Sequence, residues 1–240
     1  MSGRWTAAGT HGKNLEHQLN KDLEEKRAYV RSLQADFAAR GDALGWFEAL
    51  YKEFEGNNEM IPWADLEPNK YFAAWAQDND LKGNGRTALV VGCGLGDDAK
   101  YLHDLGFRVT AFDISPTAIE WAKRLHADTN ITFETMDLFQ PFRGWLGAFD
   151  LVLEIYTIQP LPIEMRQSVI DAIAAFVAEN GRLVVVTRGR EDDVEPDIMP
   201  WPMSRRDLSR FEENGLRQID LVEMPGEEDE PPRFVVEYRK

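Results

Sequence analysis

Three closely spaced glycines and a later carboxylate are the residues of this sequence whose types and spacing best predict chemistry. Residues 88–91 form an apolar run that ends in Gly92, Gly94 and Gly96. Glycine lacks the Cβ that would block a sharp turn or the close approach of a ligand to the backbone. Asp113 ends the next apolar run, 21 positions after Gly92, and an acid at this point can bind ribose hydroxyls. The pattern predicts a strand–helix–strand unit that binds a nucleoside.

The residue after the third glycine limits the type of nucleoside. A dinucleotide fingerprint, G-x-G-x-x-G, would place a glycine where Asp97 stands. Asp97 and Asp98 suit the positive end of the helix that follows, but they would repel a pyrophosphate held by the same amides. The ligand is therefore predicted to lack phosphate. A nicotinamide-dependent oxidoreductase is the alternative on the same type of fold.

These residues resemble the class I S-adenosylmethionine-dependent methyltransferases, and the likeness covers roughly residues 86–240. The first motif of that family reads like residues 91–96, and its second motif ends in an acid like Asp113. The resemblance implies that the glycine turn lies against the methionine part of S-adenosylmethionine, with S-adenosylhomocysteine as coproduct. It implies that Asp113 binds the ribose and that Asp137 faces the adenine amine, although a turn role is the alternative for Asp137.

The resemblance also implies a larger set of cofactor-binding residues. Met136 and Leu138 would flank the adenine, and Glu154 would face the sulfonium or the methionine amine unless it is an ordinary charged strand end. Cys93 is the lone cysteine, and we interpret it as a packing residue. The predicted set is Trp63, Gly92, Cys93, Gly94, Gly96, Asp98, Asp113, Ile114, Met136, Asp137, Leu138 and Glu154.

The N-terminal third is similar to one branch of that family, the thiopurine, thiol and halide methyltransferases. Trp46 and Tyr51 precede a Pro-Trp element at Trp63, as in that branch, but Ala64 separates Trp63 from Asp65. That departure puts the role of Asp65 in doubt. Segments 160–166 and 199–204 carry two further matches. Aromatic residues could wall a small closed pocket for the acceptor, and the predicted set is Trp46, Tyr51, Tyr71 and Trp201.

The chemistry of methyl transfer makes modest demands on catalytic side chains. The sulfonium already makes its methyl group electrophilic, so positioning of the acceptor supplies most of the acceleration. A hydroxyl usually needs a base, whereas a thiol with a pKa near ~8.5 supplies thiolate readily. No base is obvious, because His103 and His126 are predicted to lie on the surface. The sequence therefore favours a thiol or other soft acceptor.

Three side chains are catalytic candidates. His17, or His11 beside it in the N-terminal arm, could act as base for an oxygen or nitrogen acceptor, which is the alternative activity. Tyr156 could contact the methyl group or the acceptor, or simply pack in the core. Arg166 could pair with a substrate anion or with a carboxylate on its own helix. A regulator that binds S-adenosylmethionine without turnover is a further alternative.

The alternation of strand and helix patterns predicts an α/β fold. We expect a doubly wound, mostly parallel seven-stranded sheet with a C-terminal antiparallel pair. A helical extension over residues 1–82 would form part of a substrate lid, its apolar stripe packing across the sheet, and residues 83–240 would form the core. Strands are expected at 87–91, 108–112, 131–135, 149–155, 181–187, 216–224 and 233–238, and core helices at 97–105, 116–126 and 164–179.

Composition excludes several classes of partner. The formal net charge of −15 disfavours nucleic acid, whose affinity comes from lysine and arginine on phosphates. No apolar run approaches the ~20 residues that cross a bilayer, so we expect a cytoplasmic protein with a small-molecule acceptor and no metal. The pattern leaves open the identity of the acceptor, the use of a base, the order of the N-terminal arm and the oligomeric state.

Overall fold

The computed structural model describes residues 8–197, 199–226 and 230–240, with side chains from residue 23 onward. The chain divides into two compact units, Met1–Asp65 and Leu66–Lys240. The sequence placed a boundary after residue 82, whereas the contacts of the chain group residues 66–82 with the sheet. The physical reason is that Phe72, Trp75 and Ala76 are buried in the core of the second unit.

The first unit is helical. Its helix α2 buries Trp46, Leu50 and Tyr51. The Trp63 indole N–H donates to the Tyr51 hydroxyl at 2.8 Å, and the Trp63 ring meets that of Trp46 edge-on at 6.2 Å. Tyr29 donates a hydrogen bond to Glu53, which ties the two longer helices together. The elements are α1 (Ala8–Ala38), α2 (Gly45–Glu53) and the 3₁₀ turn η1 (Asn58–Met60).

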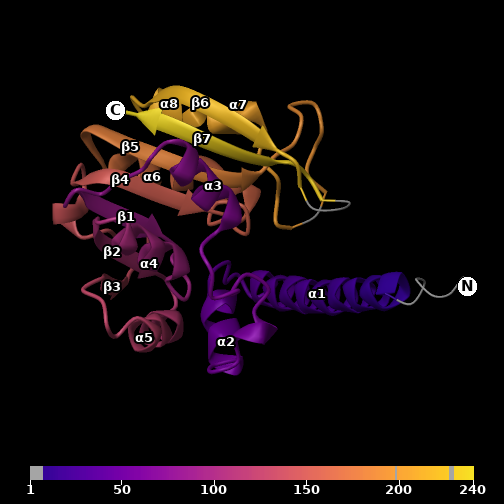
Figure 1. The fold of residues 1–240 in the computed structure, drawn as a ribbon. Helices are drawn as coiled ribbons and strands as arrows, with labels where there is room; N and C mark the ends of the chain where they lie inside the picture. The colour runs from indigo at the N-terminus through magenta and orange to yellow at the C-terminus, as the bar shows by residue number, and fades with distance from the viewer. Residues whose placement is uncertain (1–7, 198, 227–229) are drawn as a thin grey trace, which may run out of the picture. The chain divides into compact units, whose positions relative to one another are not determined.

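The second unit is built on a seven-stranded sheet with the order β3-β2-β1-β4-β5-β7-β6 (Figure 1). β7 pairs antiparallel with both β5 and β6, while the other pairs are parallel. The predicted fold class is confirmed. The strands are β1 (Thr87–Val91), β2 (Arg108–Asp113), β3 (Thr132–Thr135), β4 (Phe149–Ile155), β5 (Val177–Arg188), β6 (Arg217–Met224) and β7 (Arg233–Arg239).

Helices cover both faces of this sheet, which explains why its central strands are continuous apolar runs. One face packs against the first three helices of the unit through a common core that includes Ala99, Leu102 and Ile119. On the other face Phe211 lies 5.0 Å from the ring of Tyr238. The helices are α3 (Lys70–Asp78), α4 (Asp97–Asp104), α5 (Pro116–Leu125), α6 (Arg166–Ala175), α7 (Arg205–Leu208) and α8 (Arg210–Glu213), with 3₁₀ turns η2 (Arg143–Trp145) and η3 (Ile163–Met165).

The predicted helix over residues 164–179 is wrong at both ends. Its first residues form the 3₁₀ turn η3, and α6 ends at Ala175. The chain then enters β5 at Val177, and Asn180 takes a positive φ of 63°. The apolar side chains of Phe176 and Val177 continue the helical spacing by coincidence, because both are buried although they follow the end of α6.

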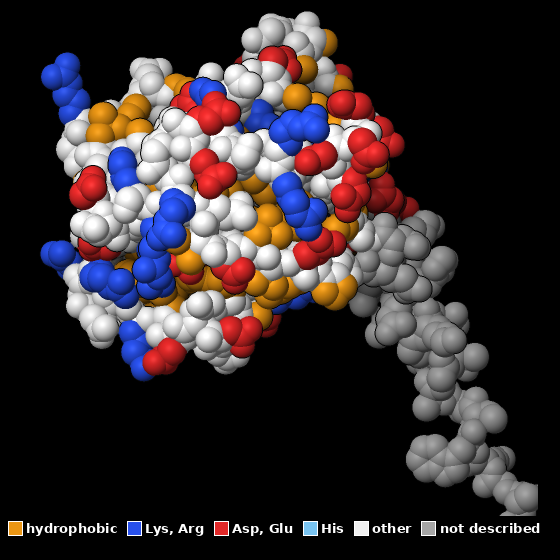
Figure 2. Space-filling model, turned by 90° about the horizontal axis from the view of Figure 1, so that it is seen from above, with side chains coloured by type: hydrophobic (Ala, Val, Ile, Leu, Met, Phe, Trp, Pro, Cys, Tyr) orange, Lys and Arg blue, Asp and Glu red, His pale blue; other side chains and the backbone are white. Residues whose placement is uncertain are grey.

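The surface carries charges of both signs. Figure 2 shows one face of the protein, on which acidic side chains lie beside basic ones across the view. Among the described residues, no helix has the length and apolar character needed to cross a membrane. No group of three or more potential metal ligands is found in that part of the chain.

Candidate functional site

The three glycines form a sharp turn at the carboxyl end of β1. Gly92, Gly94 and Gly96 have φ values of 59°, 53° and 91°, which L side chains rarely adopt. A Cβ on Gly92 would lie 2.6 Å from the Thr157 hydroxyl, and one on Gly96 would lie 2.8 Å from the ring of Phe133. The turn therefore needs glycine for its backbone conformation and for close packing.

Asp113 joins this turn from the end of the neighbouring strand. Its Oδ2 accepts from the Gly94 N–H at 3.0 Å, and its Oδ1 accepts from the Ser115 N–H at 2.9 Å. β1 and β2 are paired in register, so the carboxylate is held beside the glycines and is 7% exposed. Because carboxylate oxygens accept more than one hydrogen bond each, this arrangement fits a sugar diol. The structure brings together the residues that the sequence predicted.

The segment after β3 lies beside Asp113, at the carboxyl ends of the parallel strands. The Met136 N–H donates to the Asp113 carbonyl at 3.0 Å, and both Met136 and Leu138 are buried. The Asp137 carboxylate accepts from the Phe139 N–H at 2.9 Å and from the Gln140 side chain at 3.0 Å. Asp137 thus has the turn role that the sequence left as an alternative, and its contact with adenine stays a prediction. Ile114 is partly buried beside Asp113.

Glu154, near the end of β4, is a buried carboxyl group with few hydrogen bonds. Its side chain is fully buried, and Oε1 accepts from the N–H groups of Thr157 and Ile158 at 2.7 and 3.1 Å. Among the described residues, its Oε2 finds no hydrogen-bond partner. Burial raises the pKa of this carboxyl to about 7. Because Leu153 belongs to the core under α3–α5, strand alternation turns Glu154 to the opposite face of the sheet.

Two further predicted cofactor residues are Cys93, in the glycine turn, and Asp98, in the first turn of α4. Burial raises the pKa of the Cys93 thiol well above its usual range, as do the nearby acids, which favours the interpretation of Cys93 as a packing residue. Burial also raises the pKa of Asp98 to about 7. Asp98 accepts from the Asn69 N–H at 2.8 Å. Asp98 therefore anchors the segment that enters α3.

Tyr156 meets residues from two other segments where β4 ends, the start of α3 and the start of β7. Its φ of 57° is a strained conformation for a bulky residue, and such strain is concentrated at functional sites. Its hydroxyl accepts from the Arg233 Nε at 2.9 Å and hydrogen-bonds with the Asn69 side chain. The Arg233 guanidinium lies 5.6 Å from the ring centroid of Tyr71. Tyr156 and Tyr71, which the sequence proposed separately, lie in one cluster.

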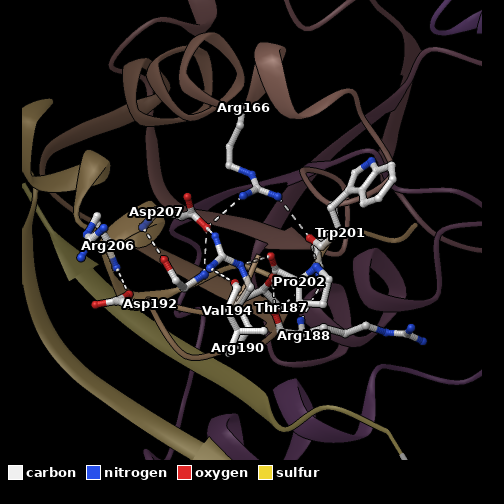
Figure 3. Close-up of polar contacts among 12 residues, drawn as sticks. Arg166, Thr187, Arg188, Arg190, Asp192, Val194, Trp201, Pro202, Arg206 and Asp207 are labelled. Carbon is white, nitrogen blue, oxygen red and sulfur yellow. Dashed lines mark hydrogen bonds and ion pairs between the residues drawn. The ribbon is translucent and has the colours of Figure 1, made fainter. Parts of the chain in front are cut away.

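Arg166 and Trp201 belong to a neighbouring polar network (Figure 3). Arg166 donates to Asp207 at 2.9 Å and to the Trp201 carbonyl at 3.2 Å, and Arg190 donates to the same Asp207 oxygen at 2.9 Å. Asp207 lies on α7, so the partner of Arg166 is a carboxylate of another helix. The buried amide of Gln159 joins this network to the turn after β4, since it donates to the Trp201 carbonyl.

Other predicted residues lie elsewhere in the chain. Trp46, Tyr51 and Trp63 belong to the first unit, where Trp46 and Tyr51 are buried and Trp63 is 41% exposed. Their proposed ligand contacts stay predictions. His17 and His11 lie outside the residues whose side chains are described.

His126 differs from its predicted surface position. Its ring stacks on Phe133 at 5.9 Å, and its Nε2 lies 3.0 Å from the Leu95 carbonyl in the glycine turn. Burial lowers its pKa. His126 therefore contacts the glycine turn from the end of α5. His103 is half-buried beside Asp104.

Sequence reasoning did not single out three residues of this edge: Asn69, Thr157 and Arg233. Asn69 had a usable signal, since an asparagine before a helical pattern is a typical N-cap, and it caps α3 through the N–H groups of Tyr71 and Phe72. Thr157 donates from its hydroxyl to the Val91 carbonyl at 2.9 Å. Arg233 follows a loop and carries no local signal for its contacts.

Comparison with known proteins agrees with this geometry. Residues 88–181 match the model of a methyltransferase domain family. Over this segment the chain is therefore similar to methyltransferase domains. The matched residues run from β1 into the first half of β5, and so include the glycine turn, Asp113 and Tyr156.

One curated relative is the 2-heptyl-1-hydroxyquinolin-4(1H)-one methyltransferase of Mycobacteroides abscessus, 28% identical over 151 residues, which are 61% of this chain. The match spans 64% of the length of that relative, less than two thirds. Among solved structures, the N-methyltransferase NodS of Bradyrhizobium japonicum, in complex with S-adenosylhomocysteine, has a TM-score of 0.62 at 18% identity, covering 81% of this chain and 97% of that one.

A second solved structure has the same type of fold over a longer stretch. The 1,6-didemethyltoxoflavin-N1-methyltransferase of Burkholderia thailandensis has a TM-score of 0.62 at 16% identity, and the alignment covers 100% of this chain and 93% of that one. At these identities, the two structures show similarity of the fold alone. The thiol branch suggested by the N-terminal residues has no counterpart among these relatives.

Proposed function

We propose that this protein is an S-adenosylmethionine-dependent methyltransferase that acts on a small molecule. The observation that carries this proposal is the hydrogen bond from the Gly94 N–H to Asp113, within a turn of three left-handed glycines. When bound, S-adenosylmethionine supplies an electrophilic methyl group. The prediction of a cytoplasmic location goes with this proposal.

Residues of this chain would hold the cofactor at the carboxyl ends of β1 and β2. Asp113 would bind the ribose hydroxyls while it keeps Gly94 in place. The glycine backbone would lie against the methionine part, which a Cβ would exclude. Met136 and Leu138 would contact the adenine with their apolar side chains. Glu154 fits a cationic amine chemically, because its buried Oε2 finds no partner among the described residues.

The acceptor most compatible with this edge is one that ionises by itself. The described residues place no histidine beside Tyr156, and burial raises the pKa of the Tyr156 phenol, which makes it a poor base. A thiol or other soft nucleophile needs little help in losing its proton. We therefore propose S-methylation as the principal activity.

An acidic hydroxyl is the second candidate, and a particular observation favours it. The relative from Mycobacteroides abscessus is a methyltransferase of a 1-hydroxyquinolone. Such an acceptor meets the same requirement, because it carries an ionisable oxygen.

Turnover with a panel of acceptors tests the proposal. The full chain would be incubated with labelled S-adenosylmethionine and thiols, halides, acidic hydroxyl compounds, phenols and amines, while S-adenosylhomocysteine is measured. We expect methyl transfer to thiols, with acidic hydroxyl compounds next. Calorimetry with S-adenosylhomocysteine and with NAD is the control for the cofactor. Binding of NAD alone would refute the proposed cofactor, and transfer to amines alone would refute the proposed preference for thiols and acidic hydroxyl compounds.

A further inference from the structure

Arg233 is a buried arginine at the end of the sheet where the parallel strands, including the strand before the glycine turn, have their carboxyl ends. It begins β7 opposite Arg188, which ends β5, and it is 5% exposed. Its Nε donates to Tyr156, its Nη1 to the Pro231 carbonyl and its Nη2 to Glu230. The turn after β4 and the chain that leads into β7, which are distant in the sequence, therefore meet at one guanidinium.

We call Arg233 and the residues that contact it the Arg233 centre, and Glu230 is its counter-ion. Its carboxylate pairs with Arg233 through one oxygen, and its other oxygen lies 3.6 Å from the Arg188 guanidinium. The carboxylate is carried by the chain just before β7, and its side chain is 14% exposed. The carboxylate of Glu230 thus lies between two arginines. The same two arginines would bind the carboxylate of a ligand equally well.

Tyr156 adds an oriented hydrogen-bond donor beside this ion pair. Its oxygen accepts from Arg233 and from the Asn69 side chain, whose own oxygen is used to cap α3. A phenol oxygen that accepts two hydrogen bonds can still donate its own proton. Among the described residues, no acceptor for that proton is found. The proton is available to a ligand.

The position of the centre suits an acceptor rather than the nucleoside. Tyr156 follows β4, the neighbour of β1, while Arg233 stands on β7, three strands from β1 in the sheet order. Three inter-strand spacings are roughly 14 Å. The centre therefore begins beside the glycine turn and extends away from Asp113 along the sheet edge.

We propose that Arg233, Arg188 and Tyr156 form the binding subsite for a carboxylate group of the methyl acceptor, and that Glu230 holds this subsite until the acceptor takes its place. This inference rests on the proposed function and narrows its substrate class to small acids that carry a thiol or an acidic hydroxyl. The acceptor carboxylate would accept from the Tyr156 hydroxyl and from Arg233, while the reacting atom points toward the glycine turn.

Matched probes test this subsite in the full chain loaded with S-adenosylhomocysteine. 4-Mercaptobenzoate and its neutral methyl ester differ in the carboxylate charge and in one methyl group, and calorimetry gives both dissociation constants without turnover. We expect the acid to bind roughly tenfold more tightly than the ester or better, in keeping with hydrogen bonds to a charged group. Tyr156→Phe should remove most of that difference. Glu230→Gln should tighten binding of the acid several-fold and leave the ester unchanged.

Glu237→Gln is the matched control. Glu237 is also a buried carboxylate between two arginines, Arg182 and Arg239, but at the other end of β7. Its change should leave both probes unaffected. Equal affinity for acid and ester, or weaker binding of the acid by Glu230→Gln, would overturn the inference.

The cofactor also has a carboxylate, and a second comparison separates the two sources. S-adenosylhomocysteine and 5′-methylthioadenosine would be titrated against the wild type and Tyr156→Phe. We expect both to bind the variant as they bind the wild type. Loss of affinity for S-adenosylhomocysteine alone would assign the subsite to the cofactor and overturn the inference. If S-adenosylhomocysteine fails to bind the wild type, the proposed function itself has failed.

Discussion

At the scale of single residues, Asp113 has two tasks that one substitution can separate. Its carboxylate fixes Gly94 and Ser115, and we assign the ribose to the same oxygens. Asp113→Asn keeps one acceptor oxygen for the turn but loses the charge. We expect the affinity for S-adenosylhomocysteine to fall by about 1.5 to 3 kcal/mol, the range for hydrogen bonds to a charged group. Calorimetry measures this change.

Asp137→Asn is the comparison for that experiment. Its carboxylate accepts hydrogen bonds within its own turn, so the same chemical change should affect affinity less. Undiminished affinity in the Asp113 variant, with the fold intact by circular dichroism, would show that the ribose binds elsewhere.

Glu154 makes a prediction about stability and pH. Its pKa is about 7 in the folded protein against 4.5 for an ordinary glutamate, because of burial. Between these values the folded state holds a proton that the unfolded state has released, so the free energy of unfolding falls as pH rises. One such group contributes a slope of up to about 1.4 kcal/mol per pH unit. The stabilisation is complete below pH 4.5 and lost above about 7.

Urea unfolding of Glu154→Gln between pH 5 and pH 8 checks this. The variant should show a shallower decline than the wild type and should be the more stable protein at pH 8. Asp98, whose pKa is also about 7, supplies the residual slope. An unchanged profile in the variant would mean that Glu154 is ionised throughout.

At the scale of elements, Asn69 connects the start of α3 to α4 and so positions α3 beside the site. Its side chain caps α3, and its N–H is held by Asp98 of α4. Asn69→Ala should lower the free energy of unfolding by about 1 kcal/mol through the lost cap. Asn69→Asp keeps the cap and should be nearly as stable as the wild type. Thermal or urea unfolding distinguishes them, and equal losses would contradict a capping role.

Elements were predictable where the pattern repeats locally. β1 and β4 occur as expected, because a strand buried on both faces must be continuously apolar. The end of α6 was missed, since the buried Val177 continues the helical spacing although the chain has already entered β5. Hydrophobic spacing records burial, and burial is shared by helices and strands.

The site was predictable only in part for a similar reason. Gly92, Gly94 and Asp113 are recognisable because the turn imposes its own local requirements on the sequence. The partners of Tyr156 come from α3 and β7, and only the folded sheet brings Asn69 and Arg233 to it. Arg166 found its carboxylate on α7, 41 residues away, which no pattern on its own helix indicates.

At the scale of the whole molecule, the boundary at Asp65 separates the aromatic residues of the first unit from the sheet that carries the glycine turn. Trp46 and Tyr51 complete a small core of their own, with Trp63 against both. The second unit contains the turn, Asp113 and the Arg233 centre. The geometry that supports the proposed activity therefore lies within one compact unit.

The Thr157 hydroxyl donates a hydrogen bond to the Val91 carbonyl, where the glycine turn begins. Because Thr157 directly follows Tyr156 and is hydrogen-bonded to the start of the glycine turn, we expect the nucleoside and the acidic acceptor to bind cooperatively. Titrating 4-mercaptobenzoate with and without S-adenosylhomocysteine gives the coupling factor, and thermodynamic reciprocity demands the same factor in the converse titration. A coupling factor of one would mean that binding of one ligand does not change the affinity for the other.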